Sequence, residues 1–258
     1  MLKKITLLLS VMLLLSLSSL KAFSATQSFD WYCIRTKDHT QPTVDKNFEF
    51  ISNYGGYYVD KDHSDNSSDK VIYLTFDAGY ENGNIAKILD SLKEENVRGT
   101  FFILDQLLIK NTDLVNRMLS EGHTVANHTA KHKDLSLMSS KEELSKELSS
   151  LEQLFKDKTG KDMPKYLRPP KGRFSRQSMQ FAHALGYKTI FWSFAYADWD
   201  NNNQMSKDAA MKKILDNVHN GEIMLLHPTS ATNASLIGEL TRTLKAQGYR
   251  FATVEELS

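Results

Sequence analysis

The chain has one cysteine, Cys33, no long apolar run and no marked excess of charge of either sign. A single cysteine excludes an intramolecular disulfide and a zinc cluster built on thiolates, so the fold must be held by its own core. The formal charge of +1 gives no electrostatic argument for nucleic acid as a partner. Neither an internal repeat nor a low-complexity tract is present, and the length suits one large domain or two small ones.

The first residues have the pattern of an export signal. Lys3 and Lys4 precede a Leu-rich apolar run at residues 5–17, and residues 22–24 supply the small side chains of a cleavage site. The run is too short for a comfortable membrane span. We expect residues 1–24 to be removed, which takes three lysines and no acid and changes the formal charge from +1 to −2. An uncleaved N-terminal anchor is the alternative, and in both cases the catalytic part is predicted to lie outside the cytoplasm.

Residues 25–70 are rich in aromatic side chains but show no regular periodicity. They contain too few aliphatic residues to bury a core of their own. We therefore expect an N-terminal extension that wraps the following domain and is closed by a mobile, polar loop at residues 61–70.

From residue 71 to residue 258, short runs rich in β-branched and aromatic residues alternate with amphipathic stretches, as in repeated strand-helix units. Five predicted helices end at a glycine just before the next strand, a position where a left-handed backbone carries no side-chain penalty. This pattern predicts an α/β fold with parallel strands but does not separate a barrel from an open doubly wound sheet. The predicted strands are residues 71–76, 99–104, 124–127, 166–168, 188–194, 222–226 and 250–253; the predicted helices are residues 84–95, 112–120, 141–158, 176–185, 207–218 and 234–246; the glycines are Gly122, Gly160, Gly186, Gly221 and Gly248.

Charged and imidazole side chains gather at the carboxyl ends of the predicted strands. In a strand-helix barrel all these ends lie on one face, where such barrels build their sites, so residues far apart in sequence are expected to converge. The residues at these positions are Asp77, His128, Arg168, Asp198 and His227.

The pair His128 and His132 has the spacing of two ligands to one metal, provided that the segment is helical or a tight turn. Two surface histidines are the alternative. Asp77 follows a near-continuous apolar strand, and a carboxylate there suits a general base poised over a metal-bound water. A hydrogen-bonded structural aspartate that caps the next loop is the other interpretation.

Three further segments complete the predicted site. Arg168, in a stiff proline-rich turn, is placed to hold Asp77 by a charge-assisted bond, single or bidentate; a loop anchor in a surface salt bridge is the alternative. Trp199, beside Asp198, suits the apolar face of a sugar ring but is equally consistent with a core residue. His227 ends a buried strand, where a lone histidine is a natural proton donor at neutral pH, particularly if an aspartate orients it.

As a set, the segments TFDAGYENG, EGHTVANHTAKH, YLRPPKGRFS, FWSFAYADWDNNNQ and LLHPTS resemble the polysaccharide deacetylase family, carbohydrate esterase family four, over residues 71–257. Together with the segment WYCIRTKDHTQP, they are most similar to the branch of delta-lactam-biosynthetic de-N-acetylases that act on spore cortex peptidoglycan. The resemblance implies a distorted (β/α) barrel with an N-terminal extension and a catalytic domain at residues 71–258.

The resemblance also implies a role for each matching residue. Asp77 matches the catalytic base and Arg168 the arginine that orients it, while His227 matches the general acid and Asp198 the carboxylate that tunes it. The metal ligands are His128 and His132. The implied substrate-binding residues are Tyr80, Asn82, Pro170, Gly172, Trp199 and Leu225.

Ala78 is a departure from the family pattern, because most members have a second aspartate there that binds the metal. The resemblance then implies a divalent metal, zinc in the first instance, that is weakly held by the two histidines. It implies peptidoglycan glycan strands as the partner, N-acetylmuramic acid as the sugar that is deacetylated, and a monomer. A deacetylase of N-acetylglucosamine in peptidoglycan or chitooligosaccharides, and a non-catalytic glycan-binding protein, are the alternatives.

Overall fold

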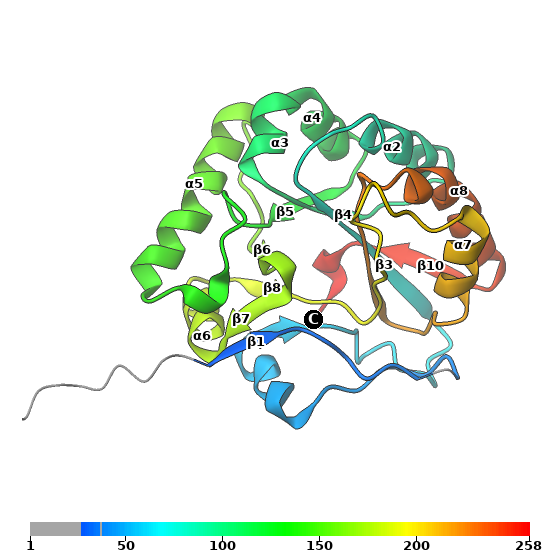
Figure 1. The fold of residues 1–258 in the computed structure, drawn as a ribbon, viewed down its shortest axis with the longest axis horizontal. Coiled ribbons are helices and arrows are strands. Elements are labelled where there is room, and N and C mark those ends of the chain that lie inside the picture. The colour runs from blue at the N-terminus through cyan, green and yellow to red at the C-terminus, as the bar shows by residue number, and fades with distance from the viewer. Residues whose placement is uncertain (1–26, 37) are drawn as a thin grey trace, which may run out of the picture.

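A parallel sheet curls through the centre of the molecule (Figure 1). The computed structural model describes residues 27–36 and 38–258, so the predicted export signal lies outside the described residues. The strand order is β10-β3-β4-β5-β6-β8-β2, and β9 pairs with β3. A parallel bridge from Phe194 to Met224 joins the chain after β8 to β9 and so closes the curl into a distorted barrel. The strands of this sheet are β2 (Gly56–Tyr57), β3 (Lys70–Ala78), β4 (Thr100–Ile103), β5 (Thr124–Asn127), β6 (Tyr166–Leu167), β8 (Lys188–Ile190), β9 (Glu222–Leu226) and β10 (Tyr249–Ala252).

Helices cover the outside of the barrel (Figure 1). Along β3, alternate side chains enter two different cores: Ile72, Leu74 and Phe76 pack on the helix side, whereas Val71 and Tyr73 pack in the barrel interior. Strand alternation therefore turns Asp77 to the interior and Ala78 to the helix side. The helices are α2 (Ile85–Glu94), α3 (Asp105–Lys110), α4 (Thr112–Ser120), α5 (Lys141–Thr159), α6 (Arg176–Ala184), α7 (Lys207–Leu215) and α8 (Ala231–Ala246).

The predicted barrel and the predicted order of strands and helices are confirmed. All five glycines that were expected to stop helices have positive φ, from 69° at Gly221 to 88° at Gly248. The sequence missed the short helix α3 and placed the start of α8 three residues late. Three short strands near the extension and four 3-10 turns were also not predicted. Those not yet given are β1 (Ser28–Asp30), β7 (Arg173–Ser175) and the turns Lys46–Tyr54, Leu135–Leu137, Pro170–Gly172 and Val254–Glu256.

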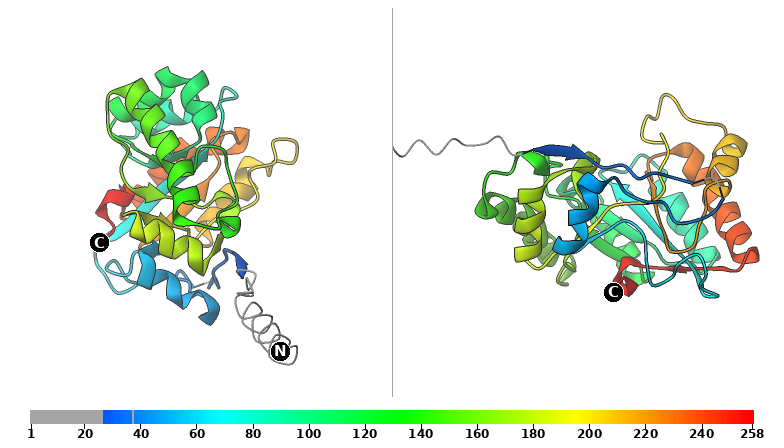
Figure 2. Two further views of the ribbon diagram at one scale, coloured as in Figure 1. Left: turned by 90° about the vertical axis from the view of Figure 1, so that its left-hand side faces the viewer. Right: turned by 90° about the horizontal axis from the view of Figure 1, so that it is seen from below.

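The segment before β3, in blue and cyan, runs along one side of the barrel (Figures 1 and 2). β1 pairs antiparallel with β7, and β2 adds to the sheet beside β8. The segment is held by aromatic packing rather than by aliphatic residues: Trp31 stacks on Phe191 with ring centroids 4.4 Å apart, and its Nε1 donates to the Trp192 carbonyl at 2.9 Å. No helix among the described residues is long and apolar enough to cross a membrane.

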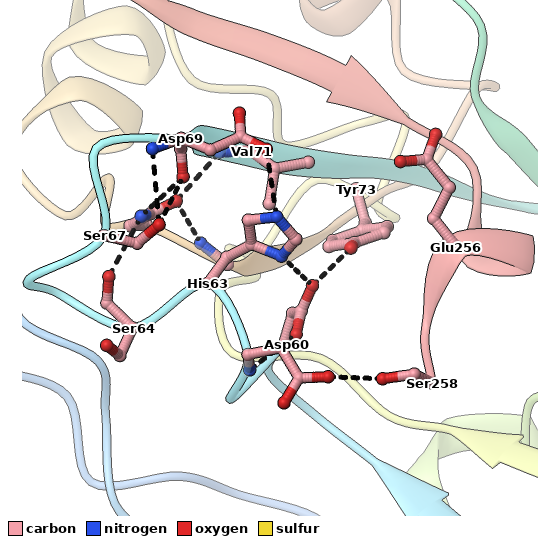
Figure 3. A network of polar contacts seen from close by, with 12 residues as sticks. Asp60, His63, Ser64, Ser67, Asp69, Val71, Tyr73, Glu256 and Ser258 are labelled. Carbon is pink, nitrogen blue, oxygen red and sulfur yellow. Dashed lines mark hydrogen bonds and ion pairs between the residues drawn. The ribbon is translucent and has the colours of Figure 1, made fainter.

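The loop at residues 61–70, which was expected to be mobile, is tied to the barrel by a polar network (Figure 3). The imidazole of His63 contacts Asp60 through Nδ1 at 2.7 Å and Asp69 through Nε2 at 3.1 Å. Asp60 accepts a hydrogen bond from the Tyr73 hydroxyl in the barrel interior, and Asp69 pairs with Arg250 of β10 at 2.9 Å. The sequence showed only a polar, turn-forming loop, because these partners come from strands at both ends of the domain.

Candidate active site

The strand ends bring the predicted catalytic residues to one mouth of the barrel. Asp77 lies at the end of β3, and His128, Arg168 and His227 are the first residues after β5, β6 and β9. Asp198 lies in the long segment that follows β8. Because the strands are parallel, these five positions share one face. The predicted convergence is confirmed by the contacts below.

Asp77 and Arg168 form a buried ion pair. Arg168 Nη1 donates to Asp77 Oδ1 at 3.0 Å, and the two side chains are 0% and 9% exposed. The bond is single rather than bidentate: Nη1 also donates to Thr75 Oγ1 at 2.8 Å, and Nε and Nη2 donate to the carbonyls of Ile190 and Phe191. Such anchoring fixes the guanidinium and, through it, the carboxylate. Arg168 is therefore a site residue and not a surface loop anchor.

The electrostatics keep Asp77 ionised. Burial alone would raise the pKa of its carboxyl, but His128, Arg168 and His227 together outweigh that effect and hold the pKa below its usual range. His128 Nε2 lies 3.5 Å from Asp77 Oδ2. An anionic carboxylate at the mouth of the barrel has the protonation state that a general base requires.

His128 and His132 come together in a tight turn rather than in a helix. Thr129 and His132 have φ of 68° and 57°, and the two imidazole centroids are 5.2 Å apart. The buried carboxylate of Glu147, on α5, accepts from the Lys131 backbone at 2.7 Å and so stabilises the turn. The sequence gave no sign of this role for Glu147, because the two segments meet only in the folded chain.

Burial moves both imidazoles toward the neutral form that metal ligands need. His128 Nδ1 lies 2.8 Å from the Arg168 carbonyl. Since a carbonyl only accepts, the proton is on Nδ1 and the lone pair of Nε2 is free. Burial lowers the pKa of His128. His132 is exposed at its surface, yet partial burial of its ring, helped by His128, lowers its pKa to about 4.

The two imidazoles fit one divalent ion, but the described residues contain no cluster of three or more His, Cys, Asp or Glu side chains able to hold one. Ala78 has no carboxylate, and its side chain is fully buried in the core on the helix side. His128 and His132 would therefore be the two nitrogen ligands that these residues could offer to such an ion.

His227 and Asp198 form a second pair at this mouth of the barrel. His227 Nδ1 lies 2.7 Å from Asp198 Oδ1, and the backbone N–H of His227 donates to Asp198 Oδ2 at 2.7 Å. Asp198 is 1% exposed. Burial lowers the pKa of His227, but the bond to Asp198 outweighs this and the net shift is upward. The imidazole is therefore oriented by Asp198, which also shifts its pKa upward.

The predicted substrate-binding residues divide into two groups. Trp199 and Tyr80 are 62% and 43% exposed, and the Trp199 ring lies 6.3 Å from that of His227 between centroids. Trp199 is thus not a core residue, and its face is available to a ligand. The other four are less accessible or are engaged within the protein. Leu225, Pro170 and Gly172 are buried, and Asn82 donates to the Thr229 carbonyl at 2.8 Å.

Asn84 and Asn233 are site residues that the sequence did not indicate. Asn84 also donates to the Thr229 carbonyl, at 2.9 Å, and so ties the loop after β3 to the loop that carries His227. Asn233 donates to Asp198 Oδ2 at 2.6 Å. It was missed because the predicted α8 began at residue 234, which left this position in a loop. The capping serine Ser230, which accepts from Asn233 N, was the available signal.

The profile of the family described as polysaccharide deacetylase matches residues 64–190. The chain is 38% identical over 232 residues to the peptidoglycan-N-acetylmuramic acid deacetylase PdaA of Bacillus subtilis, covering 90% of this chain and 86% of that protein. It is 36% identical over 190 residues to the peptidoglycan-N-acetylglucosamine deacetylase PgdA of Listeria monocytogenes, covering 74% of this chain and 39% of that longer protein.

The same family appears among solved structures. The structure of Bacillus subtilis PdaA, a family 4 carbohydrate esterase, matches with a TM-score of 0.83 at 37% identity, covering 90% of this chain and 97% of that one. The chain therefore belongs to the polysaccharide deacetylase family, the family 4 carbohydrate esterases, and is a deacetylase of the hydrolase class.

Proposed function

We propose that the protein removes the N-acetyl group from N-acetylmuramic acid residues of peptidoglycan. The observation that carries this proposal is the presence of two complete, separately oriented pairs at one barrel mouth: Asp77 with Arg168, and His227 with Asp198. A glycan-binding protein without catalysis has no need of both a base and an acid. The muramic sugar is supported by the similarity to PdaA over nearly the whole chain.

The chain's own residues suit amide hydrolysis. Asp77 takes a proton from the attacking water, and Arg168 keeps this carboxylate ionised and aimed. His227 gives a proton from Nε2 to the departing amine while Asp198 holds Nδ1. Trp199 presents its flat face to the sugar ring. A divalent metal, zinc in our proposal, would be held by His128 and His132 and would supply Lewis acidity to the reaction.

The proposed place of action is outside the cytoplasmic membrane, on cell-wall glycan strands of the spore cortex. In this reading the substrate is a muramic acid that has already lost its stem peptide, and the amine freed by deacetylation closes on the lactyl carboxyl to give the delta-lactam. N-acetylglucosamine is the competing sugar, and the similarity to PgdA over 74% of this chain supports it as the second candidate.

The deciding experiment measures acetate released from peptide-free and peptide-bearing peptidoglycan, with bound metal quantified. The native protein, His128→Ala and Ala78→Asp are compared, and mass spectrometry of the digested strands identifies which sugar has lost its acetyl group. We expect acetate from muramic acid in the peptide-free strands and little from His128→Ala. Release from glucosamine alone would replace the proposal by the second candidate. No release from either strand at full metal loading would remove the enzymatic proposal altogether.

A further inference from the structure

Asn233 occupies a central position behind the catalytic histidine. It lies in the first turn of α8, is fully buried, and directs its amide at the loop between β9 and α8. Its Nδ2 donates to Asp198 Oδ2 at 2.6 Å and to the His227 carbonyl at 3.0 Å. Both hydrogens of the amide are thus used by the two members of the proposed acid pair.

The orientation of this amide is fixed by chemistry on both sides. A carboxylate and a carbonyl only accept, so the nitrogen of Asn233 must face Asp198 and His227. The amide oxygen accepts from the hydroxyl of Tyr196, which is itself buried. Every polar atom of Asn233 therefore has a partner, and a buried network of this kind rigidifies the groups that it joins.

Among the described residues, only His227 would still donate to the Asp198 carboxylate if Asn233 were removed. The remaining donors to its carboxylate come from His227, through Nδ1–H and the backbone N–H. The backbone N–H of His227 would then be the one donor to Asp198 outside the imidazole, and with less restraint on the carboxylate Nε2 could move away from the leaving nitrogen. Asn233 connects the pair to α8, and Tyr196 connects it to the segment after β8.

We propose that Asn233, with Tyr196 behind it, is a positioning residue for the general acid: it locks Asp198 to the backbone of His227 so that Nε2 points at the departing amine. This inference rests on the proposed N-deacetylase activity. It adds a requirement that the base Asp77 does not share, because Asn233 contacts only the acid side of the site.

The first test separates acid catalysis from general damage by changing the leaving group. Asn233→Leu keeps the branched shape of the side chain but removes its three side-chain hydrogen bonds. We expect kcat for N-acetyl glycan to fall at least about tenfold, part of the 10²–10⁴-fold that a general acid contributes, with little change in KM. Hydrolysis of p-nitrophenyl acetate should change less than about twofold, because its phenolate leaves without a proton. An equal loss on both substrates, or no loss on the glycan, would overturn the proposal.

Two further variants guard against a simple folding defect. Tyr196→Phe removes only the hydroxyl behind Asn233 and should lower glycan kcat about two- to tenfold, the size of one neutral hydrogen bond. Asn220→Leu is the matched control: Asn220 is also buried, and its side chain makes four hydrogen bonds just before β9, at the opposite end of that strand from His227. We expect it to lower stability without changing the ratio of the two activities. If Asn220→Leu changed the ratio of glycan to p-nitrophenyl acetate hydrolysis as much as Asn233→Leu does, the effect of Asn233→Leu would have to be attributed to general loss of structure.

A readout independent of turnover keeps this inference distinct from the proposed function. Proton NMR follows the Nδ1–H of His227, assigned by its loss in His227→Gln, since a hydrogen bond to a carboxylate moves this signal to low field. We expect the signal in the native protein and in Asn220→Leu, and its loss or broadening in Asn233→Leu. An unchanged signal in Asn233→Leu would refute the positioning role even in an active enzyme. A native protein that shows the signal but releases no acetate would refute only the proposed function.

Discussion

Glu222 gives the most quantitative prediction from this structure. It is the first residue of β9 and is 0% exposed. Its Oε2 accepts from the His219 backbone at 3.1 Å, and its Oε1 has no hydrogen-bond partner among the described residues. Burial raises the pKa of this carboxyl from 4.5 to about 8, and the His219 N–H and Arg35 offset only part of the effect. At neutral pH the folded protein therefore holds a proton that the unfolded chain has released.

The sign and size of the effect follow from proton linkage. Between pH 4.5 and about 8 the unfolded state binds fewer protons than the folded state, so stability falls as pH rises, by about 1.4 kcal/mol per pH unit. Over the whole interval the cost is on the order of 5 kcal/mol, comparable with the net stability of many domains. Glu222→Gln removes this cost because the amide does not titrate.

The assay is urea unfolding followed by tryptophan fluorescence at about pH 5.5, 6.5 and 7.5. The difference in unfolding free energy between Glu222→Gln and the native protein should grow in favour of the variant by about 2 to 3 kcal/mol over this range. Glu222→Leu is the control. Its unfolding free energy should differ from that of Glu222→Gln by a constant amount due to packing, but its difference from the native protein should change with pH by the same amount per unit. The nearby titratable groups His219 and Cys33, with pKa values of about 4 and 11, stay neutral throughout. A difference in unfolding free energy between Glu222→Gln and the native protein that stays constant with pH would refute the reasoning.

Three further predictions concern the site and the extension. Asp77→Asn should lower kcat by about 10²–10⁴-fold with the fold retained by circular dichroism, and near-native acetate release would exclude it as the base. Ala78→Asp should lower the Tm of the protein, because it buries a carboxylate on the helix side; an unchanged Tm in calorimetry would refute this. Burial lowers the pKa of His63, but Asp60 and Asp69 outweigh it and the net shift is upward. Its stabilising contribution is therefore complete below pH 6.5 and lost as pH rises through the folded-state pKa, so native protein and His63→Gln should differ in unfolding free energy at low pH and converge at high pH. A constant difference would contradict the role of that ion-pair cluster.

The sequence predicted the barrel because the relevant physics is local. Alternating strand and helix periods, and glycines such as Gly160 at helix ends, are visible in short windows and were confirmed. It also predicted that Asp77, Arg168, Asp198 and His227 would converge, since parallel strands bring their carboxyl ends to one face. The errors arose where local patterns were weak, as in the short helix α3 and the loop tied down by His63.

Residue types and their order thus determined the fold class, the family and the candidate catalytic residues. Tertiary structure decided the partners: which atoms of Arg168 reach Asp77, that Glu147 holds the histidine turn, and that Asn233 stands behind His227. It also decided that Glu222 is buried with an unpaired oxygen. The physical reason is that the strength of a charge or hydrogen bond depends on burial and on neighbours distant in sequence, which only the folded chain brings together.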